Sequence, residues 1–217
     1  MPLNQTEFLD ALEQNALRLC FVGMSNIGKS HSSRLLKSEL NFDSYEVDDQ
    51  IQQSMSLNDI GSSANWMGYP FDERYQKNKH TYLTLESEKT LAAPINTSQN
   101  LVLDTTGSVI YLETSVKNWL SENFIVVNFD CAENMLSTMS DNYFKHPKPV
   151  VWGESFNPKA EEEGLNALKR CYPQLLTDRT RLYRELADVT IPGEVSRSQG
   201  LSAQRLVDLI YLNLPKH

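Results

Sequence analysis

The sequence predicts a three-layer α/β fold: a central parallel sheet of about five strands, flanked by helices and carrying a lid loop. Two observations predict it. Short apolar runs alternate along the chain with helical patterns, which is typical of a parallel sheet with crossover helices. The first apolar run, Arg18–Val22, leads directly into a glycine-rich turn and then a helical segment, as in the opening unit of many such sheets.

The chain divides into an N-terminal helical extension, residues 1–16, and one domain, residues 17–217. In the extension, Phe8, Leu9 and Leu12 predict a short amphipathic helix. In the domain, residues 141–157 contain prolines and aromatics without any period, so we expect the lid there. Apolar runs predict strands at Arg18–Val22, Tyr45–Val47, Leu101–Leu103, Phe124–Phe129 and Val189–Ile191. Helical spacing predicts helices at Lys29–Leu40, Asp72–Leu91, Val116–Trp119, Ala132–Met139, Lys159–Tyr172, Thr177–Ala187 and Ser202–Leu214.

Composition restricts the class of protein. The net charge is −8 and no basic stripe is visible, which argues against a nucleic-acid partner. The three cysteines, Cys20, Cys131 and Cys171, lack metal-ligand spacing, and their odd number favours reduced thiols. Residues 1–16 contain no Lys or Arg, unlike a signal peptide, and the apolar runs are too short for a membrane span. We therefore expect a cytoplasmic protein without membrane contact, and a monomer is favoured.

The glycine-rich turn, Gly23-Met-Ser-Asn-Ile-Gly28-Lys29-Ser30, matches the Gly-x4-Gly-Lys-Ser pattern of a P-loop. Glycines at both ends let backbone N–H groups point at an anion, and the next helix adds the positive charge of its N-terminus. Lys29 is expected to reach the β- and γ-phosphates of a nucleotide, and the Ser30 hydroxyl to ligate Mg²⁺. The expected nucleotide-binding residues here are Gly23, Ser25, Asn26, Ile27, Gly28, Lys29, Ser30 and His31, with His31 on the helix surface rather than acting as a base.

Two acidic segments are predicted beside the P-loop, at the ends of strands. If Tyr45–Val47 is a strand, Glu46 and Asp48 project from the same face, where carboxylates can serve Mg²⁺ and an acceptor hydroxyl. A solvated acidic turn is the alternative. Asp104 closes the apolar run Leu101–Leu103, as does the metal-side carboxylate of many nucleotide-binding sheets. An aspartate that merely caps the turn is the alternative.

Four segments in this order resemble the shikimate kinase family, a branch of the nucleoside-monophosphate-kinase-like P-loop fold. The resemblance covers Leu17 to Leu214 and implies a phosphotransferase that uses ATP and Mg²⁺ and acts on an alcohol group of a small, anionic metabolite. The segments are the P-loop Gly23–Ser30; Tyr45-Glu46-Val47-Asp48, similar to Tyr-Asp-x-Asp; Thr106-Gly107-Ser108-Val109, similar to Thr-Gly-Gly-Gly-Ser-Val; and Arg179-Thr-Arg-Leu-Tyr183 with Ala187-Asp-Val-Thr-Ile191, similar to Arg-x-Pro-Leu-Tyr-x-x-x-Ala-Asp-x-x-Ile.

The resemblance implies roles for individual residues. Glu46 stands where the family has a metal-side aspartate. Asp48 matches the aspartate that binds the acceptor hydroxyl and helps to activate it. Arg179 matches an arginine that pairs with the acceptor carboxylate, for which a guanidinium fork is well suited. The alternative for Arg179 is a surface salt bridge with Asp178 or Glu185.

The lid and the acceptor side depart from the family pattern. Lys148 replaces a lid arginine and is expected to stabilise the transferred phosphoryl group, unless it is a solvated loop lysine. Arg197 lies near the adenine-side loop. Asp72 replaces an arginine that clamps the substrate carboxylate, which leaves Arg74 as a substitute, and the glycine turn around Gly107 is shortened. Loss of one charged clamp weakens acceptor binding by about 2–5 kcal/mol if nothing replaces it.

We therefore expect an ATP-dependent kinase that transfers the γ-phosphoryl group to a hydroxyl of a shikimate-like metabolite. Three alternatives stay open: a kinase for a different hydroxylated metabolite, a nucleotide-binding regulatory protein on a scaffold that no longer phosphorylates shikimate, and a nucleotide hydrolase in which water replaces the acceptor. The expected catalytic residues are Lys29, Asp48 and Lys148, the acceptor-binding residues are Asp48, Arg74, Gly107 and Arg179, and the metal-side residues are Ser30, Glu46 and Asp104.

Overall fold

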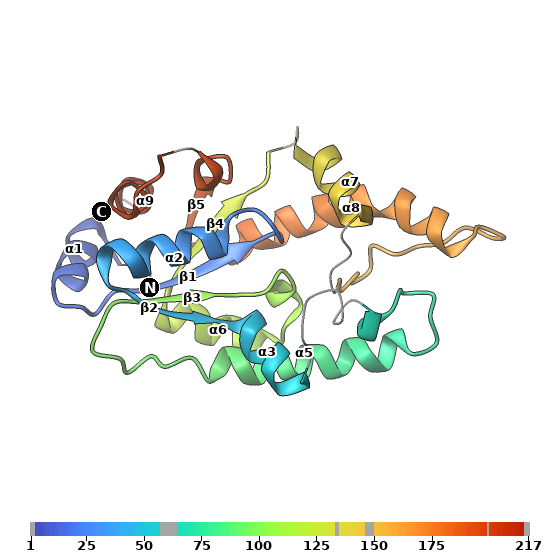
Figure 1. The fold of residues 1–217 in the computed structure, drawn as a ribbon, viewed down its shortest axis with the longest axis horizontal. Coiled ribbons are helices and arrows are strands. Elements are labelled where there is room, and N and C mark those ends of the chain that lie inside the picture. Colours follow the sequence, from blue (N-terminus) through green and yellow to red (C-terminus); the bar gives the residue numbers. More distant parts are fainter. Residues whose placement is uncertain (1–2, 57–64, 133–134, 146–149, 199, 215–217) are drawn as a thin grey trace.

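The centre of the molecule is a five-stranded, all-parallel sheet with the strand order β2-β3-β1-β4-β5 (Figure 1). The computed structural model describes residues 3–56, 65–132, 135–145, 150–198 and 200–214. Helices cover both faces of the sheet, so the predicted three-layer α/β fold is confirmed. The strands are β1 (Arg18–Gly23), β2 (Asp43–Glu46), β3 (Leu101–Asp104), β4 (Ile125–Asp130) and β5 (Val189–Pro192).

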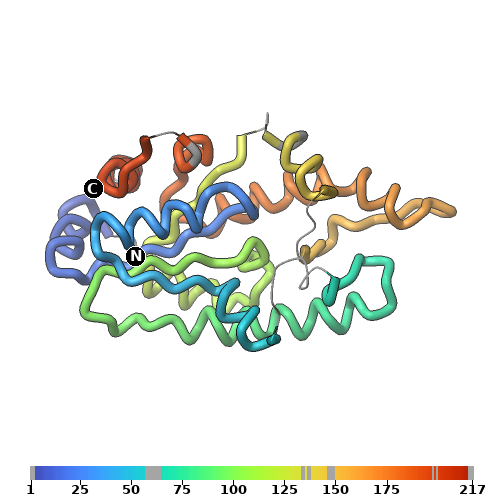
Figure 2. The backbone as a smooth tube through the Cα atoms, viewed as in Figure 1, coloured from blue at the N-terminus to red at the C-terminus, as the bar shows by residue number. Residues whose placement is uncertain are grey.

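Helices connect the strands and extend beyond them. In Figure 1, α2 lies in front of the sheet and α6 behind it. Figure 2 shows α5 and α8 running past the carboxyl ends of the strands, so both helices have residues beside the P-loop. The helices are α1 (Gln5–Glu13), α2 (Lys29–Leu40), α3 (Val47–Met55), α5 (Tyr75–Leu91), α6 (Thr114–Asn123), α7 (Leu136–Lys145), α8 (Gly164–Leu186) and α9 (Ala203–Leu212), with short 3-10 helices η1 (Val109–Tyr111) and η3 (Val195–Arg197). None of these described helices is long and apolar enough to cross a membrane.

The predicted N-terminal helix is present as α1, and it packs onto the domain. Its Phe8 is fully buried and lies with its ring 6.1 Å from that of Tyr211 on α9. The side chain of Asn100 accepts a hydrogen bond from Leu17 N at 2.8 Å and donates one to Leu12 O at 3.0 Å. These contacts attach α1 to the edge of the sheet at which the strands begin.

The predicted helices Lys159–Tyr172 and Thr177–Ala187 form one helix, α8, with Pro173 inside it. A proline within a helix costs about 3 kcal/mol. The interruption is tolerated because a buried apolar stripe continues on both sides of the proline, from Leu168 to Leu176 and beyond. The prediction of two separate helices was therefore wrong.

The predicted strand Tyr45–Val47 ends one residue early, because α3 begins at Val47. Val47 and Ile51 are both buried and lie one helical turn apart, while the acidic Asp48 lies in the first turn, where the helix dipole favours a negative charge. Consequently Glu46 lies at the end of a strand and Asp48 in a helix. The expectation that both project from one face of a strand was wrong.

The segment 141–157, predicted as a lid loop, is not irregular throughout. Residues 141–145 belong to α7, and residues 146–149 lie outside the described residues. Val150–Trp152 is buried: the Tyr75 hydroxyl donates to Val150 O at 3.2 Å and accepts from Trp152 N at 3.0 Å. Trp152 packs against Tyr172 of α8, with ring centroids 5.8 Å apart. These residues are therefore fixed to α5 and α8.

Candidate active site

The P-loop runs from β1 into α2, and its two motif glycines have backbone conformations that other residues rarely adopt. Gly23 has φ +140° and Gly28 has φ +110°. A Cβ atom on Gly23 would lie 2.9 Å from Phe129 O, and one on Gly28 would lie 2.3 Å from Ser196 Oγ. The side chain of Lys29 turns back into the loop, where Nζ donates to Gly23 O at 3.1 Å and to Met24 O at 3.2 Å. The loop is thus held in a compact form with its lysine inside.

Ser196 attaches the segment after β5 to the P-loop. Its hydroxyl oxygen lies 2.5 Å from Ile27 O and 2.7 Å from Gly193 O, so that its one proton is shared between the two carbonyls, and the side chain is buried. Sequence reasoning missed this serine, because nothing in its local pattern distinguishes it. Arg197, the next residue, ends η3. Its expected position beside the adenine stays a prediction.

Two carboxylates lie at the ends of neighbouring strands, beside the first turn of α2. Glu46 and Asp104 are opposite each other in the register of β2 and β3. Asp104 is 4% exposed; its Oδ2 accepts from Ser30 Oγ at 2.5 Å, and its Oδ1 has no hydrogen-bond partner among the described residues. Burial raises the pKa of both carboxyl groups, and the charges of Asp104 and Asp49 raise that of Glu46 further. A cation bound between Glu46 and Asp104 would offset the unfavourable burial and mutual repulsion of the two negative charges.

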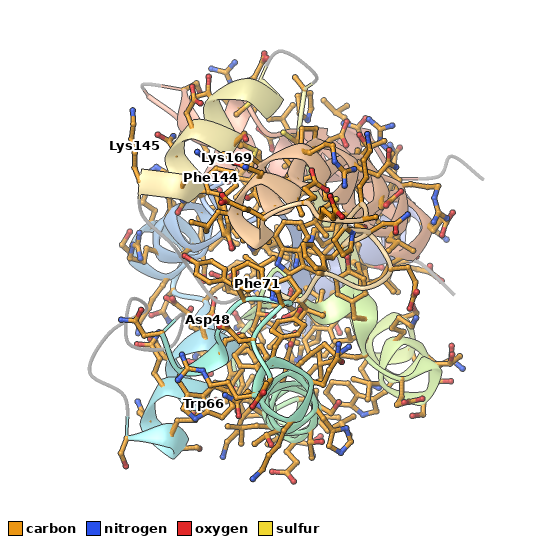
Figure 3. All side chains as sticks on the ribbon, turned by 90° about the vertical axis from the view of Figure 1, so that its right-hand side faces the viewer. Asp48, Trp66, Phe71, Phe144, Lys145 and Lys169 are labelled. Atoms are coloured by element: carbon orange, nitrogen blue, oxygen red, sulfur yellow. The ribbon has the colours of Figure 1, made fainter. Side chains whose placement is uncertain are left out.

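A cavity of about 670 Å³ opens between the P-loop, α3, the turn after β3 and α8. Asp48 lines it from α3, Gly107 from the turn after β3, and Arg179 from α8. Figure 3, which views the end of the molecule where the strands finish, shows α7 and α8 above and α3 and α5 below, with Asp48 and Phe71 between the two pairs. The structure therefore brings the P-loop, Asp48, Gly107 and Arg179 to one cavity.

Arg179 is a buried cation in this cavity, 6% exposed. Its terminal nitrogen donates to Val151 O at 2.8 Å, its guanidinium lies 5.4 Å from the centre of the Tyr111 ring, and its Nε has no hydrogen-bond partner in the described part of the chain. A Cβ atom on Gly107 would lie 3.3 Å from the other terminal nitrogen and 3.3 Å from Ser25 Oγ. The guanidinium is therefore next to both the turn and the P-loop.

The alternative interpretation of Arg179, a surface salt bridge, is wrong. Asp178 accepts from Ser155 Oγ at 2.8 Å, and Glu185 pairs with Arg181 at 2.6 Å. Among the described carboxylates, none forms an ion pair with Arg179. A buried guanidinium without a counter-ion is costly unless an anion joins it.

Known proteins similar to this chain were found by sequence and by structure. No family model matches the sequence. Over 195 residues the chain is 26% identical to the shikimate kinase of Mannheimia succiniciproducens, covering 87% of this chain and 92% of that protein. Solved shikimate kinases share the fold. The shikimate kinase of Acinetobacter baumannii in complex with shikimate has a TM-score of 0.56 and 21% sequence identity, over 90% of this chain and 92% of that chain. The shikimate kinase of Bacteroides thetaiotaomicron has a TM-score of 0.56 and 15% sequence identity, over 89% of this chain and 97% of that chain.

The chain is similar to shikimate kinases in sequence and in fold. The resemblance inferred from four short segments is thereby confirmed, together with the enzyme class, a phosphotransferase that acts on a hydroxyl group.

Some of the residues matched to shikimate kinase roles are not in the cavity. Arg74 is exposed, does not line the cavity, and donates to Asn65 O at 2.8 Å. Asp72 accepts from Tyr69 N at 2.8 Å and so caps the turn before α5. The expectation that Arg74 replaces the missing clamp is wrong, because it belongs to this turn rather than to the inward face of α5. Lys148 lies outside the described residues.

Sequence reasoning also missed Glu86, which is fully buried behind the turn after β3. Its two carboxyl oxygens form hydrogen bonds with the hydroxyls of Thr106 and Ser108, the latter at 2.6 Å. Burial raises the pKa of this carboxyl to about 7. In a helix with many polar residues, a single glutamate gives no signal of burial, so its position became visible only in the fold. His31, in contrast, is exposed at the rim of the cavity, as expected of a helix-surface residue.

Proposed function

We propose that this protein is an ATP-dependent kinase that transfers the γ-phosphoryl group to a hydroxyl of a small, anionic, shikimate-like metabolite. The observation that carries the proposal is the pairing of Asp48 and the buried Arg179 across one cavity into which the P-loop opens. A P-loop alone would serve many nucleotide-binding proteins. A buried arginine without a counter-ion favours an anionic ligand, and a carboxylate lining the same cavity is suited to a hydroxyl.

On the nucleotide side, the backbone of the P-loop and Lys29 hold the phosphates. Ser30 and Asp104 would hold a Mg²⁺ ion, since Asp104 Oδ1 is buried without a hydrogen-bond partner among the described residues, and Glu46 would add negative charge beside it. Among the described residues no three His, Cys, Asp or Glu side chains converge on one point, as expected where water and phosphate supply the other ligands. Bound there, Mg²⁺ supplies charge neutralisation of the β- and γ-phosphates.

On the acceptor side, Arg179 binds the anionic group of the metabolite, and Asp48 orients its hydroxyl and takes up the proton as the oxygen attacks the γ-phosphorus. Phosphoryl transfer needs the attacking and leaving oxygens in line, so the enzyme would contribute positioning and charge neutralisation rather than covalent chemistry. Lys148 would add positive charge to the transferred group. Its part in the reaction follows from its place in the sequence alone.

The test is a coupled assay of ADP release with MgATP, with and without shikimate. We expect saturable, shikimate-dependent ADP release that is lost in Asp48→Asn and falls at least thirtyfold in kcat/KM in Arg179→Met. Arg181→Met is the matched control, because Arg181 lies on the same helix with an exposed side chain paired to Glu185. ATP binding with ADP release that no hydroxylated acid changes and that survives Asp48→Asn would refute a kinase and indicate a hydrolase.

A second candidate is a kinase for a different hydroxylated acid. It is favoured by Asp72, which caps a turn where the family pattern has an arginine clamp, and by the Thr106 side chain, which occupies a position of the family's glycine turn. ADP release that depends on another hydroxy acid, but not on shikimate, and still requires Arg179 would identify this case. We also propose a cytoplasmic location, supported by three cysteines that are all free and buried.

A further inference from the structure

The carboxyl of Glu86 and the hydroxyls of Thr106 and Ser108 form a closed triangle of contacts. Each hydroxyl lies against one carboxyl oxygen, and the two hydroxyls are 2.9 Å apart. All three residues are buried, and Glu86 has no measurable exposure. Thr106 Oγ1 also accepts a hydrogen bond from Ser108 N at 3.0 Å.

Counting protons shows which form of Glu86 fits this triangle. A serine or threonine hydroxyl carries one proton and two acceptor sites, and an ionised carboxylate carries none. If Glu86 is ionised, both hydroxyl protons point at the carboxylate and the contact between Thr106 and Ser108 has no proton. If Glu86 is a carboxylic acid, Thr106 donates to Glu86, Glu86 donates to Ser108, and Ser108 donates to Thr106. Every contact of the triangle then contains one proton, and the Tyr82 hydroxyl forms further hydrogen bonds with Thr106 and Ser108 from outside it.

We infer that Glu86 is a positioning residue of the acceptor site, held as a carboxylic acid in a closed hydrogen-bond ring with Thr106 and Ser108. The ring fixes the turn that presents Gly107 to the cavity. On the other side of this turn, the Tyr183 hydroxyl donates to Gly107 O at 2.5 Å, and Arg179 lies next to Gly107. For its kinetic consequence the inference rests on the proposed function, because it concerns how the acceptor is held.

The groups around Glu86 agree with a neutral acid near pH 7. Burial raises its pKa to about 7; the hydrogen bonds from Ser108 and Thr106 lower it, Asp48 on α3 raises it, and Arg179 on α8 lowers it. The two phenols that face it, Tyr82 on α5 and Tyr183 on α8, have raised pKa values through burial and so carry no charge in this range. Loss of the proton would open the ring and place a negative charge behind the anion site.

The experiment compares Glu86→Gln with the wild type. Glutamine reproduces the acid form, since its carbonyl accepts from Thr106 and its amide donates to Ser108. We expect the acceptor KM of the wild type to rise about tenfold between about pH 6 and pH 8.5, with a smaller change in kcat and in the KM for MgATP. In Glu86→Gln the acceptor KM should stay low across this range. Glu88→Gln, an exposed glutamate on the same helix, should follow the wild type.

A second readout needs no turnover. In the ligand-free protein labelled with carbon-13 and nitrogen-15, the Glu86 carboxyl carbon and the Gly107 amide should titrate together near pH 7, and in Glu86→Gln the Gly107 amide should not titrate. A Glu86 carboxyl that titrates at the ordinary value of 4.5 overturns the inference, as does joint titration with an acceptor KM that does not change. If no acceptor is turned over, the proposed function fails, and the nuclear magnetic resonance titration still decides whether the ring exists.

Discussion

Replacing Glu86 by glutamine should change how the stability of the protein depends on pH. The folded state raises the pKa of this carboxyl from its ordinary value of 4.5 to about 7. The native state therefore binds a proton more tightly than the unfolded state. Each unit of pKa difference corresponds to about 1.4 kcal/mol, so the difference of about 2.5 corresponds to about 3 kcal/mol.

The sign follows from the direction of the shift. Between pH 4.5 and about 7 the native state keeps a proton that the unfolded state has released, so the stabilisation is complete below this window and is lost as the pH rises through it. Relative to Glu86→Gln, the wild type should lose about 3 kcal/mol of unfolding free energy between pH 4.5 and about pH 8. The other carboxyls with raised pKa values, Glu46, Asp104 and Asp188, contribute equally to both proteins and cancel in the difference.

Urea unfolding at a series of pH values, extrapolated to water, measures this difference. Glu88→Gln serves as the control, because removing an exposed carboxyl on the same helix should leave the pH dependence unchanged. A constant gap between wild type and Glu86→Gln across the series would refute the reasoning, since it would mean that Glu86 has the same proton affinity folded and unfolded.

Three further predictions concern the P-loop and α1. Lys29→Ala should abolish phosphoryl transfer, measured as ADP release, while the melting temperature stays near that of the wild type; retained turnover would remove the P-loop from the mechanism. Ser196→Ala removes the hydrogen bond to Ile27 O and should weaken ATP binding about fivefold in a calorimetric titration, whereas an unchanged Kd would show that the loop holds its form without it. Phe8→Ala should lower the unfolding free energy by about 3–5 kcal/mol in urea, because a fully buried ring against Tyr211 is lost; a cost below about 1 kcal/mol would contradict the packing of α1 described above.

The features that could be predicted from the sequence are those that depend on residues close together in the chain. The P-loop follows from the spacing of its glycines and Lys29, since the backbone conformations at Gly23 and Gly28 exclude a side chain. The central strands β1, β3 and β4 follow from apolar runs, because a strand covered on both faces has little polar alternation. Both features are encoded by neighbours in the chain.

The errors arise where distant segments decide. Two helices were predicted where the structure has one, because the buried apolar stripe on both sides of Pro173 depends on packing in the folded protein. The sequence around Glu86 does not indicate that its side chain is buried. The burial results from contact with Thr106, which lies 20 residues later in the chain, in the turn after β3. The role of Arg179 was expected from a family resemblance. Only the structure shows that this arginine is buried and forms no ion pair with a described carboxylate. Burial of a polar group is a property of the assembled fold.

The position of α1 next to α9 has a practical consequence. Both helices lie at the end of the sheet where the strands begin, opposite the cavity, and Phe8 and Tyr211 join them (Figure 1). A protein tethered to a sensor surface near either helix would therefore present its open cavity to the solution. The same proximity makes the fold suitable for circular permutation, in which a short linker joins α9 to α1 and new ends are opened in an exposed loop.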